Sequence, residues 1–318
     1  MGDRARAYTD SKLNELEQEL EREYARVGRK AIALFMVYMK LHGKKARELF
    51  AVYEQKRRSG TPEEAKEAEE EYKQELKNVT ARQDYKKMAA SIVALLVAAD
   101  AEAHKRTNKF LPDIYVKNYN SLEVPVKLGY RFDLINEHTV RNLRFGDLKL
   151  LKDERWNQRR LKAQILQGIL NGESIPKIAK RLEPMVNGNA EAAIRNARTA
   201  VTYAENQGRL DSMRAAEEEL GLVYRKQWIA THDNRTRDSH LEVDGDIVDL
   251  DKPFVVGDSE MMCPGDPAGE PAEFFNCRCT MNRVLVGIKK EDGTIAPVRT
   301  DAPSRNYTPY RERNKNAD

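Results

Sequence analysis

The chain has 318 residues, enough for two domains, because a single hydrophobic core rarely grows beyond about 250–300 residues. Charged residues make up 33% of it and aromatic residues only 7%, with a mean hydropathy of −0.74, so we expect long, solvent-exposed helices rather than one compact globule. The 55 basic and 51 acidic residues nearly cancel, and the resulting formal charge of +4 does not by itself indicate nucleic-acid binding.

Hydropathy argues against a membrane protein. The most apolar run, residues 31–39, is too short to cross a bilayer, and no export signal is visible. The three cysteines therefore indicate a protein of a reducing compartment, where disulfides are rare.

The N-terminal third, residues 1–111, is typical of a long helical hairpin. Between residues 11 and 58, apolar side chains recur at intervals of three and four. Thr61 then opens a capping box with a first-turn proline, which begins a second helix. We expect an elongated antiparallel pair over residues 10–110 that projects from the C-terminal body, with no strand between residues 11 and 56.

A linker and a helical block are expected over residues 112–189. Helical periodicity stops at Pro112, which predicts a loop or extended segment over residues 112–133. Residues that typically begin or end helices then divide the chain into separate helices. The expected order is a helix ending at Asn171-Gly172, a helix over 175–185 capped by Ser174, a turn at Asn187-Gly188-Asn189, and a helix over 190–220 stopped by Gly221.

A basic run lies in this block. Its most closely spaced members are Arg155, Arg159 and Arg160, accompanied by Arg141, Arg144 and Lys162. Such a helix face can contact DNA phosphates without reading sequence, and it can equally be solvated or bind an acidic patch on a partner protein. Both interpretations stay open.

Residues 221–286 predict a small β-rich knuckle with long loops, because apolar, β-branched segments flank a middle rich in turn residues. The fold class that follows is α+β, mostly α. All three cysteines lie in this stretch, at Cys263, Cys277 and Cys279, and His240 precedes them. A disulfide between Cys277 and Cys279 would have poor geometry. Metal ligation and packing as small reduced hydrophobic residues are the two alternatives.

No phosphate-binding loop or hydrolase motif is present. Acidic, basic and imidazole side chains do gather near the knuckle, and a hydrolase site around Asp233 and His240 is conceivable. We favour a turn-forming, ion-paired loop, because no nucleophile accompanies these residues. Its expected members are Asp233, Arg235, Arg237 and Asp266.

An ordered series of motifs over residues 190–286 resembles the phage minor head proteins, the head-morphogenesis family that includes the F protein of phage Mu. The series is Asn196-Ala-Arg198-Thr-Ala-Val-Thr-Tyr-Ala-Glu205-Asn206-Gln-Gly208-Arg, Gly221, Lys226-Gln-Trp228, Asp233-Asn-Arg235-Thr236-Arg237-Asp-Ser-His240, Asp244-Gly245, Pro264-Gly265-Asp266-Pro267 and Asn276-Cys277-Arg278-Cys279. The resemblance assigns a minor head domain to residues 190–288.

The resemblance implies a non-enzymatic minor capsid protein of a tailed bacteriophage, located at the portal vertex or inner capsid and acting in head assembly or DNA packaging and ejection. Its expected partners are the portal, major capsid or scaffolding protein, and packaged DNA without sequence preference. The host cytoplasm is its expected location during assembly. A phage-encoded hydrolase or toxin-like enzyme, with a site around Asp233, His240 and residues 276–279, is the alternative, since domains of this family are sometimes fused to toxin or peptidase domains.

The resemblance also implies a zinc-ribbon-like knuckle, in which a Cys-x-x-Cys pair accompanies the Asn-Cys-Arg-Cys element. Here Arg237 and His240 stand where that pair would be. One possibility is a structural zinc ion held by His240, Cys263, Cys277 and Cys279. The other, which we favour from the sequence, is a metal-free knuckle in which Arg237 takes the place of the ion and pairs with Asp233 or Asp266.

The C-terminal segment, residues 289–318, has few apolar side chains and prolines at Pro297, Pro303 and Pro309. It cannot bury enough apolar surface to fold alone. We expect it to be extended and ordered only against a partner.

Overall fold

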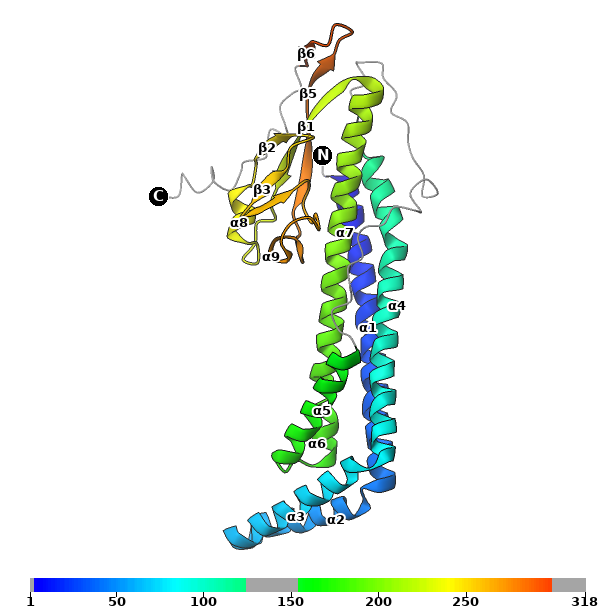
Figure 1. Ribbon diagram of the computed structural model, residues 1–318, viewed down its shortest axis with the longest axis vertical. Coiled ribbons are helices and arrows are strands. Elements are labelled where there is room, and N and C mark those ends of the chain that lie inside the picture. Colours follow the sequence, from blue (N-terminus) through cyan, green and yellow to red (C-terminus); the bar gives the residue numbers. More distant parts are fainter. Residues whose placement is uncertain (1–2, 124–153, 299–318) are drawn as a thin grey trace, which may run out of the picture. The chain divides into compact units, whose positions relative to one another are not determined.

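The computed structural model describes residues 3–123 and 154–298 (Figure 1). The chain forms two compact units: unit 1 comprises residues 1–17, 106–149 and 195–318, and unit 2 comprises residues 18–105 and 150–194. Helices dominate the N-terminal two thirds, and short strands follow. The helices are α1 (Arg4–His42), α2 (Lys44–Ser59), α3 (Pro62–Ala81), α4 (Gln83–Tyr119), α5 (Glu154–Leu170), α6 (Ile175–Lys180), α7 (Glu183–Leu220), α8 (Asp238–Glu242) and α9 (Pro271–Phe274).

The strands are β1 (Leu222–Ile229), β2 (Ile247–Asp249), β3 (Phe254–Val256), β4 (Ser259–Met261), β5 (Thr280–Lys289) and β6 (Ile295–Pro297). The protein is therefore α+β and mostly α, as the sequence predicts. Residues 11–42 and 44–56 are helical, without a strand, which also agrees with the prediction.

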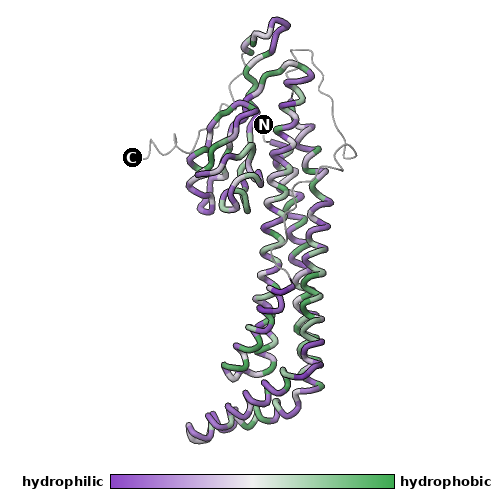
Figure 2. Tube along the Cα trace, viewed as in Figure 1, coloured by the Kyte–Doolittle hydropathy of each residue, from purple (hydrophilic) through white to green (hydrophobic). Residues whose placement is uncertain are grey.

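Polar and apolar residues alternate along the helices, and Figure 2 shows no long uniformly apolar segment in them. Within the described ranges, no helix combines the length and the apolar character that crossing a membrane requires.

The described part of unit 2 contains helices and no strand. Its core includes Tyr24, Phe35, Ile92 and Leu96 from α1 and α4, each no more than 1% exposed. Helices α2 and α3 form a hairpin, and Thr61 is the N-cap residue of its second helix. There the Glu64 backbone N–H donates to Thr61 Oγ1 (3.2 Å), and the Glu64 carboxylate accepts from the Thr61 N–H (2.9 Å). The predicted capping box is confirmed.

A cluster of buried polar side chains lies inside unit 2. Asp100 accepts hydrogen bonds from the Tyr24 hydroxyl and from Asn189 Nδ2, the latter at 3.3 Å. The same Asn189 amide donates to Asn157 Oδ1 (3.1 Å). Such a cluster favours one helix packing over others, because a slipped register would leave buried polar groups without partners.

Three sequence predictions about helix ends were wrong. Helix α4 continues through Pro112 to Tyr119, whereas a loop was expected from residue 112. The hydrogen bond lost at proline is offset by packing, since Leu111, Ile114 and Tyr115 are all buried. The rest of the expected loop, residues 124–133, lies outside the described residues.

Helix α7 likewise runs through Asn187-Gly188-Asn189, where a turn was expected. Asn residues favour turns when their side chains bond to the local backbone. The Asn189 amide bonds instead to Asp100 and Asn157, so the helix continues. The preceding helix α6 is also shorter than expected, ending at Lys180, and the Ser174 side chain makes no capping bond.

Unit 1 contains a four-stranded antiparallel sheet in the order β2-β1-β5-β6 and a separate β3-β4 hairpin. Strands β1 and β5 pair from Leu222↔Ile288 to Ile229↔Thr280, with an irregularity between Val223 and Tyr224. Helix α7 ends as predicted at Gly221, whose φ of 66° is accessible to glycine and lets the chain turn directly into β1.

The segment after residue 289 is in part ordered against the chain itself. Strand β6 pairs with β5 through Gly287↔Pro297 and Lys289↔Ile295, so residues 295–297 are extended as predicted, but the prediction that they are ordered only against a partner was wrong. A proline is tolerated there because β6 is an edge strand. The remainder of that tail, residues 299–318, lies outside the described residues.

Candidate functional site

Three of the residues singled out in the sequence converge in unit 1. His240 Nδ1 lies 3.3 Å from Cys279 Sγ and 3.7 Å from Cys277 Sγ. Their ligand atoms all fall within 4.8 Å of one another, and the three side chains are no more than 2% exposed. Imidazole and thiol groups in this arrangement can hold a soft divalent metal ion.

Helix α7 and strand β1 position the cluster. Thr202 Oγ1, on α7, donates to the Cys277 carbonyl oxygen (2.8 Å), and the Asn276 N–H donates to Thr199 Oγ1 (2.9 Å). Asn276 itself has a φ of 56°, in the left-handed region that asparagine tolerates better than most residues. His240 packs edge-on against the Trp228 ring, with ring centroids 5.5 Å apart.

The fourth cysteine or histidine ligand expected from the sequence is elsewhere. Cys263 is buried, but its Sγ lies 4.0 Å from Gln207 Oε1 and does not belong to the cluster. Burial raises its pKa well above the ordinary thiol value. The predicted set of four ligands was therefore wrong at Cys263, which packs as a reduced core residue.

The two clustered thiols differ in acidity. Hydrogen bonds that Cys277 and His240 donate to the Cys279 sulfur hold the pKa of Cys279 well below the ordinary thiol value despite its burial. The same hydrogen bond to Cys279, reinforced by burial, raises the pKa of Cys277. The cluster thus favours a thiolate at Cys279.

Glu273 was not predicted from the sequence. His240 Nε2 lies 3.1 Å from Glu273 Oε2, and the Ser239 hydroxyl donates to the same oxygen at 2.8 Å. Glu273 lies in α9, 33 residues from the histidine, and no motif marked it. Only the fold brings this carboxylate to the imidazole.

Arg237 does not occupy the cluster as expected. Its guanidinium donates to the carbonyl oxygens of Phe275 (2.6 Å) and Glu273 (3.4 Å). Asp233 pairs with Arg278 instead, with one contact at 2.7 Å, and also lies 3.8 Å from Arg235. The predicted pairing of Arg237 with Asp233 or Asp266 was wrong.

Asp266 forms hydrogen bonds with the backbone of the turn in which it lies. Its carboxylate accepts from the backbone N–H groups of Met262 (2.8 Å) and Ala268 (2.9 Å). That arrangement fixes the loop before α9 and is typical of turn-forming aspartates. Asp266 therefore stabilises a loop, as the sequence suggests, but through the backbone rather than through arginine.

A second histidine–carboxylate pair was also missed. His232 Nε2 lies 2.9 Å from Asp244 Oδ2, and the other oxygen of Asp244 accepts from the Ala230 N–H at 2.8 Å. In the sequence, the Asp244-Gly245 dipeptide indicates only a turn. No local spacing links residue 244 to residue 232, and only the folded loop brings the two side chains together.

The helical part of the motif series forms a buried polar network in unit 1. Arg209 donates to Asn118 Oδ1 (3.1 Å), Met281 O (3.2 Å) and Asp3 Oδ2 (2.6 Å). One turn earlier, Glu205 lies 3.2 Å from Arg209 and is fully buried. The network ties α7 to α4, β5 and the residues preceding α1.

Two further partners complete this network. Arg6 in α1 donates to Glu205 Oε2 at 2.8 Å, and Asn206 Nδ2 donates to the carbonyl oxygens of Thr202, Pro264 and Cys279 at 2.9–3.3 Å. Buried, mutually satisfied polar groups of this kind specify a unique packing. These motif residues therefore have a structural role.

The basic residues of the central block are partly described. Arg155, Arg159, Arg160 and Lys162 are exposed on α5, and Arg160 lies over the Trp156 ring, 5.6 Å from its centroid. Arg141 and Arg144 lie outside the described residues. The exposed arginines are available to an anionic partner.

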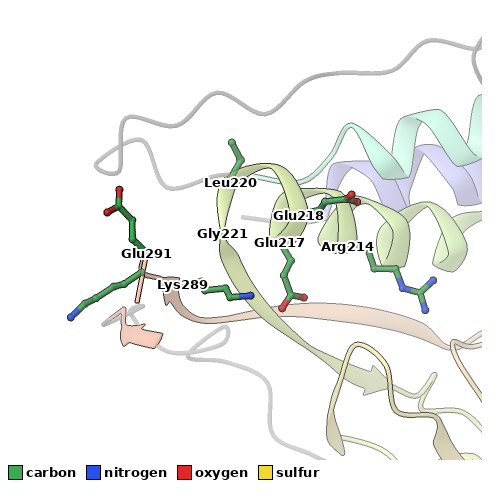
Figure 3. Close-up of a pocket in the computed structure, with 8 residues that line it drawn as sticks. Arg214, Glu217, Glu218, Leu220, Gly221, Lys289 and Glu291 are labelled. Atoms are coloured by element: carbon green, nitrogen blue, oxygen red, sulfur yellow. The ribbon is translucent and has the colours of Figure 1, made fainter. Parts of the chain in front are cut away.

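A shallow pocket of about 620 Å³ lies in unit 1 where α7 turns into β1 (Figure 3). Three acidic and three basic side chains line it: Glu217, Glu218, Glu291, Arg214, Lys289 and Lys290. Burial raises the pKa of Glu217. Because the opposite charges balance in number, the pocket favours neither an anionic nor a cationic ligand.

Comparison with known proteins finds similarity to phage head proteins. Residues 159–282 match the family described as Phage Mu protein F like protein. The chain is 30% identical over 155 residues to the minor head protein GP7 of Bacillus phage SPP1, a match that covers 46% of this chain and 47% of that protein. No solved structure matches the chain significantly.

Two bacterial proteins are also similar. One is named NAD(+)–arginine ADP-ribosyltransferase EFV, from Enterococcus faecalis, and is 30% identical over 186 residues, covering 56% of this chain and 37% of that protein. The other is the uncharacterized protein YqbB of Bacillus subtilis, 25% identical over 170 residues, covering 51% of this chain and 54% of that protein. The matches span about a third to a half of these relatives. Residues 159–282 therefore resemble the phage minor head protein family.

Proposed function

We propose that the protein is a minor head protein of a tailed bacteriophage, incorporated into the virion during head morphogenesis. The observation that carries this proposal is the match of residues 159–282 to the Phage Mu protein F like family, together with the similarity to minor head protein GP7. Its specific partner is proposed to be the portal protein, with the major capsid or scaffolding protein as alternatives.

The surface of unit 2 supports a function in protein–protein contact. A groove of about 680 Å³ is lined mainly by apolar side chains, including Met36 and Val37. Val37 is 56% exposed and Leu41, one turn further along α1, is 72% exposed. Exposed apolar surface beside charged residues is typical of sites that bind other proteins.

The test uses the phage genome that encodes the chain. Purified particles are analysed by mass spectrometry, and a nonsense mutation in the gene is compared with its suppressed form for head yield and infectious titre. We expect the chain in purified heads and a loss of titre without suppression. Particles that lack the chain and retain normal titre would contradict the proposal.

Association with the portal is tested separately, by co-expression with the portal protein of the same phage and affinity purification. A stable complex that includes the full chain supports the portal as partner. Purification of the chain with the capsid or scaffolding protein instead would replace the portal in the proposal.

The second candidate function is enzymatic, because one relative is named as an arginine ADP-ribosyltransferase. That name belongs to a protein of which the match covers only 37%. We propose that the chain itself is not an enzyme. Incubation with labelled NAD⁺ and an arginine-containing acceptor should transfer no label, and transfer that depends on residues of this chain would favour the enzyme.

A further inference from the structure

We propose that His240, Cys277 and Cys279 bind one thiophilic divalent metal ion with a structural role, and that Glu273 positions the histidine for it. The distances fit a tetrahedral ion. Zn–S bonds of about 2.3 Å and Zn–N bonds of about 2.0–2.1 Å place nitrogen and sulfur about 3.6 Å apart. His240 Nδ1 lies 3.3 and 3.7 Å from the two sulfur atoms.

The second observation is the orientation of the imidazole. When the ion is bound, His240 carries its proton on Nε2, where Glu273 Oε2 accepts it, and the Nδ1 lone pair is directed at the ion beside the two sulfurs. Metal-binding histidines commonly donate their other N–H to a carboxylate in this way. Ser239 donates to the same Glu273 oxygen and holds the carboxylate in place.

Charge balance is the third observation. A divalent cation, two thiolates and a neutral imidazole sum to zero, so the complex carries no net charge into a site where the three side chains are at most 2% exposed. Arg237 does not fill the cluster, because its guanidinium donates to the carbonyl oxygens of Phe275 and Glu273. This arrangement favours a bound ion over the metal-free knuckle.

The ion would strengthen the link between two segments that hydrogen bonds from Arg237 and Ser239 already join. His240 lies in the short helix α8, whereas Cys277 and Cys279 follow α9 and lead into β5. Cys263 is not a ligand in this proposal, which assigns three of the four positions around the ion. Cys263 is therefore a matched control, a buried cysteine in the same unit but outside the cluster.

The experiment measures metal directly. The full chain is purified under reducing conditions without chelator, and its zinc content is determined by elemental analysis. We expect close to one zinc per chain in the native protein and in Cys263→Ser, and loss of zinc in Cys279→Ser. Absence of zinc even after reconstitution, or equal loss in both variants, would overturn the proposal.

A spectroscopic measurement on the native chain tests the site without relying on variants, which can fail to fold. Replacement of zinc by Co²⁺ in the native chain should produce sulfur-to-cobalt charge-transfer bands and the visible bands of a tetrahedral site. Bands typical of six-coordinate cobalt with oxygen ligands would contradict the assignment. These readouts are independent of head assembly, so the metal site and the proposed function can fail separately.

The role of Glu273 is tested by Glu273→Gln, which keeps the shape of the side chain. We expect the variant to retain the cobalt spectrum but to bind zinc about 10–100-fold more weakly in competition with a chelating dye, as outer-shell substitutions typically do. Glu270→Gln, an exposed glutamate at the start of the same short helix, is the matched control. Equal affinity in the native chain and Glu273→Gln would remove Glu273 from the proposal.

Discussion

Lys226 is fully buried in strand β1, an unusual place for a lysine. Its Nζ donates to the Met262 carbonyl oxygen (2.8 Å) and lies 5.2 Å from the centroid of the Phe254 ring. Burial lowers its pKa from 10.5 to about 8, and the nearby Arg214 acts in the same direction, while Cys263 and Asp266 oppose it. The sequence places Lys226 in a family motif but gives no sign of its burial.

This shift predicts a dependence of stability on pH. Between pH 8 and about 10.4, the ordinary lysine value, the unfolded chain binds a proton that the folded chain does not, so this group makes the free energy of unfolding rise with pH. In Lys226→Met the contribution should be absent. Urea unfolding from pH 7.5 to 10 measures both proteins, and parallel curves would show that Lys226 does not titrate in this window.

At the candidate site, the sequence predicted three of the four residues that the structure brings together. The spacing of Cys277 and Cys279 fixes their proximity, and the motif series pointed to His240. Glu273 could not be predicted, because only the packing of α9 against α8 brings its carboxylate to the imidazole. Cys263 was assigned wrongly for the same reason, since burial of a cysteine and ligation by a cysteine look alike in sequence.

At the scale of elements, helix ends were predicted correctly where local capping and turn-forming residues determine them. The capping box at Thr61, the end of α5 before Asn171 and the stop at Gly221 follow from local chemistry. The errors at Pro112 and at residues 187–189 arose where packing overrides local preference. Strand β6 was missed because its three residues gain order from pairing with β5, not from their own apolar content.

Replacement of two glycines of helix α7 by alanine should change the stability of the protein in opposite directions. A Cβ at Gly208 would lie 2.5 Å from the Tyr115 carbonyl oxygen and 3.2 Å from the Tyr119 nitrogen, both backbone atoms of α4. Gly208→Ala should therefore lower stability by about 1–3 kcal/mol, although alanine is the better helix former. The side chain has no room unless the two helices separate.

Gly188→Ala is the matched variant. The nearest atom to a Cβ there belongs to the Trp156 ring, at 4.0 Å, so the better helix propensity should raise stability by up to about 1 kcal/mol. Urea denaturation followed by circular dichroism compares the two variants. A destabilised Gly188→Ala would indicate that α7 is not a regular helix at the expected turn.

At the scale of the whole molecule, the four sequential domains expected from composition remain a prediction. The two compact units are defined by contacts in space, and each combines segments that lie far apart in the sequence. Helices α1, α4 and α7 each contribute residues to both units. Periodicity can find such helices, but it does not show where along a helix the set of packing partners changes.

The exposed arginines of α5 predict non-specific binding to duplex DNA. The variant with Arg155→Gln, Arg159→Gln and Arg160→Gln should bind more weakly at low salt and reduce the slope of log affinity against log salt by up to about 3. Lys44→Gln with Arg57→Gln and Arg58→Gln, exposed on α2, is the control for total charge. Affinity of the native chain that is unchanged between low and moderate salt would exclude a phosphate mechanism.

The network around Arg209 has a consequence for biosynthesis. Asp3 lies 206 residues before its partner Arg209, and Arg6 lies 199 residues before Glu205 and 272 before the Arg278 carbonyl oxygen that it also contacts. At about 5–20 residues per second, the ribosome makes Arg209 roughly 10–40 seconds after Asp3. The first turn of α1 therefore lacks these hydrogen-bond partners until most of the chain has been translated.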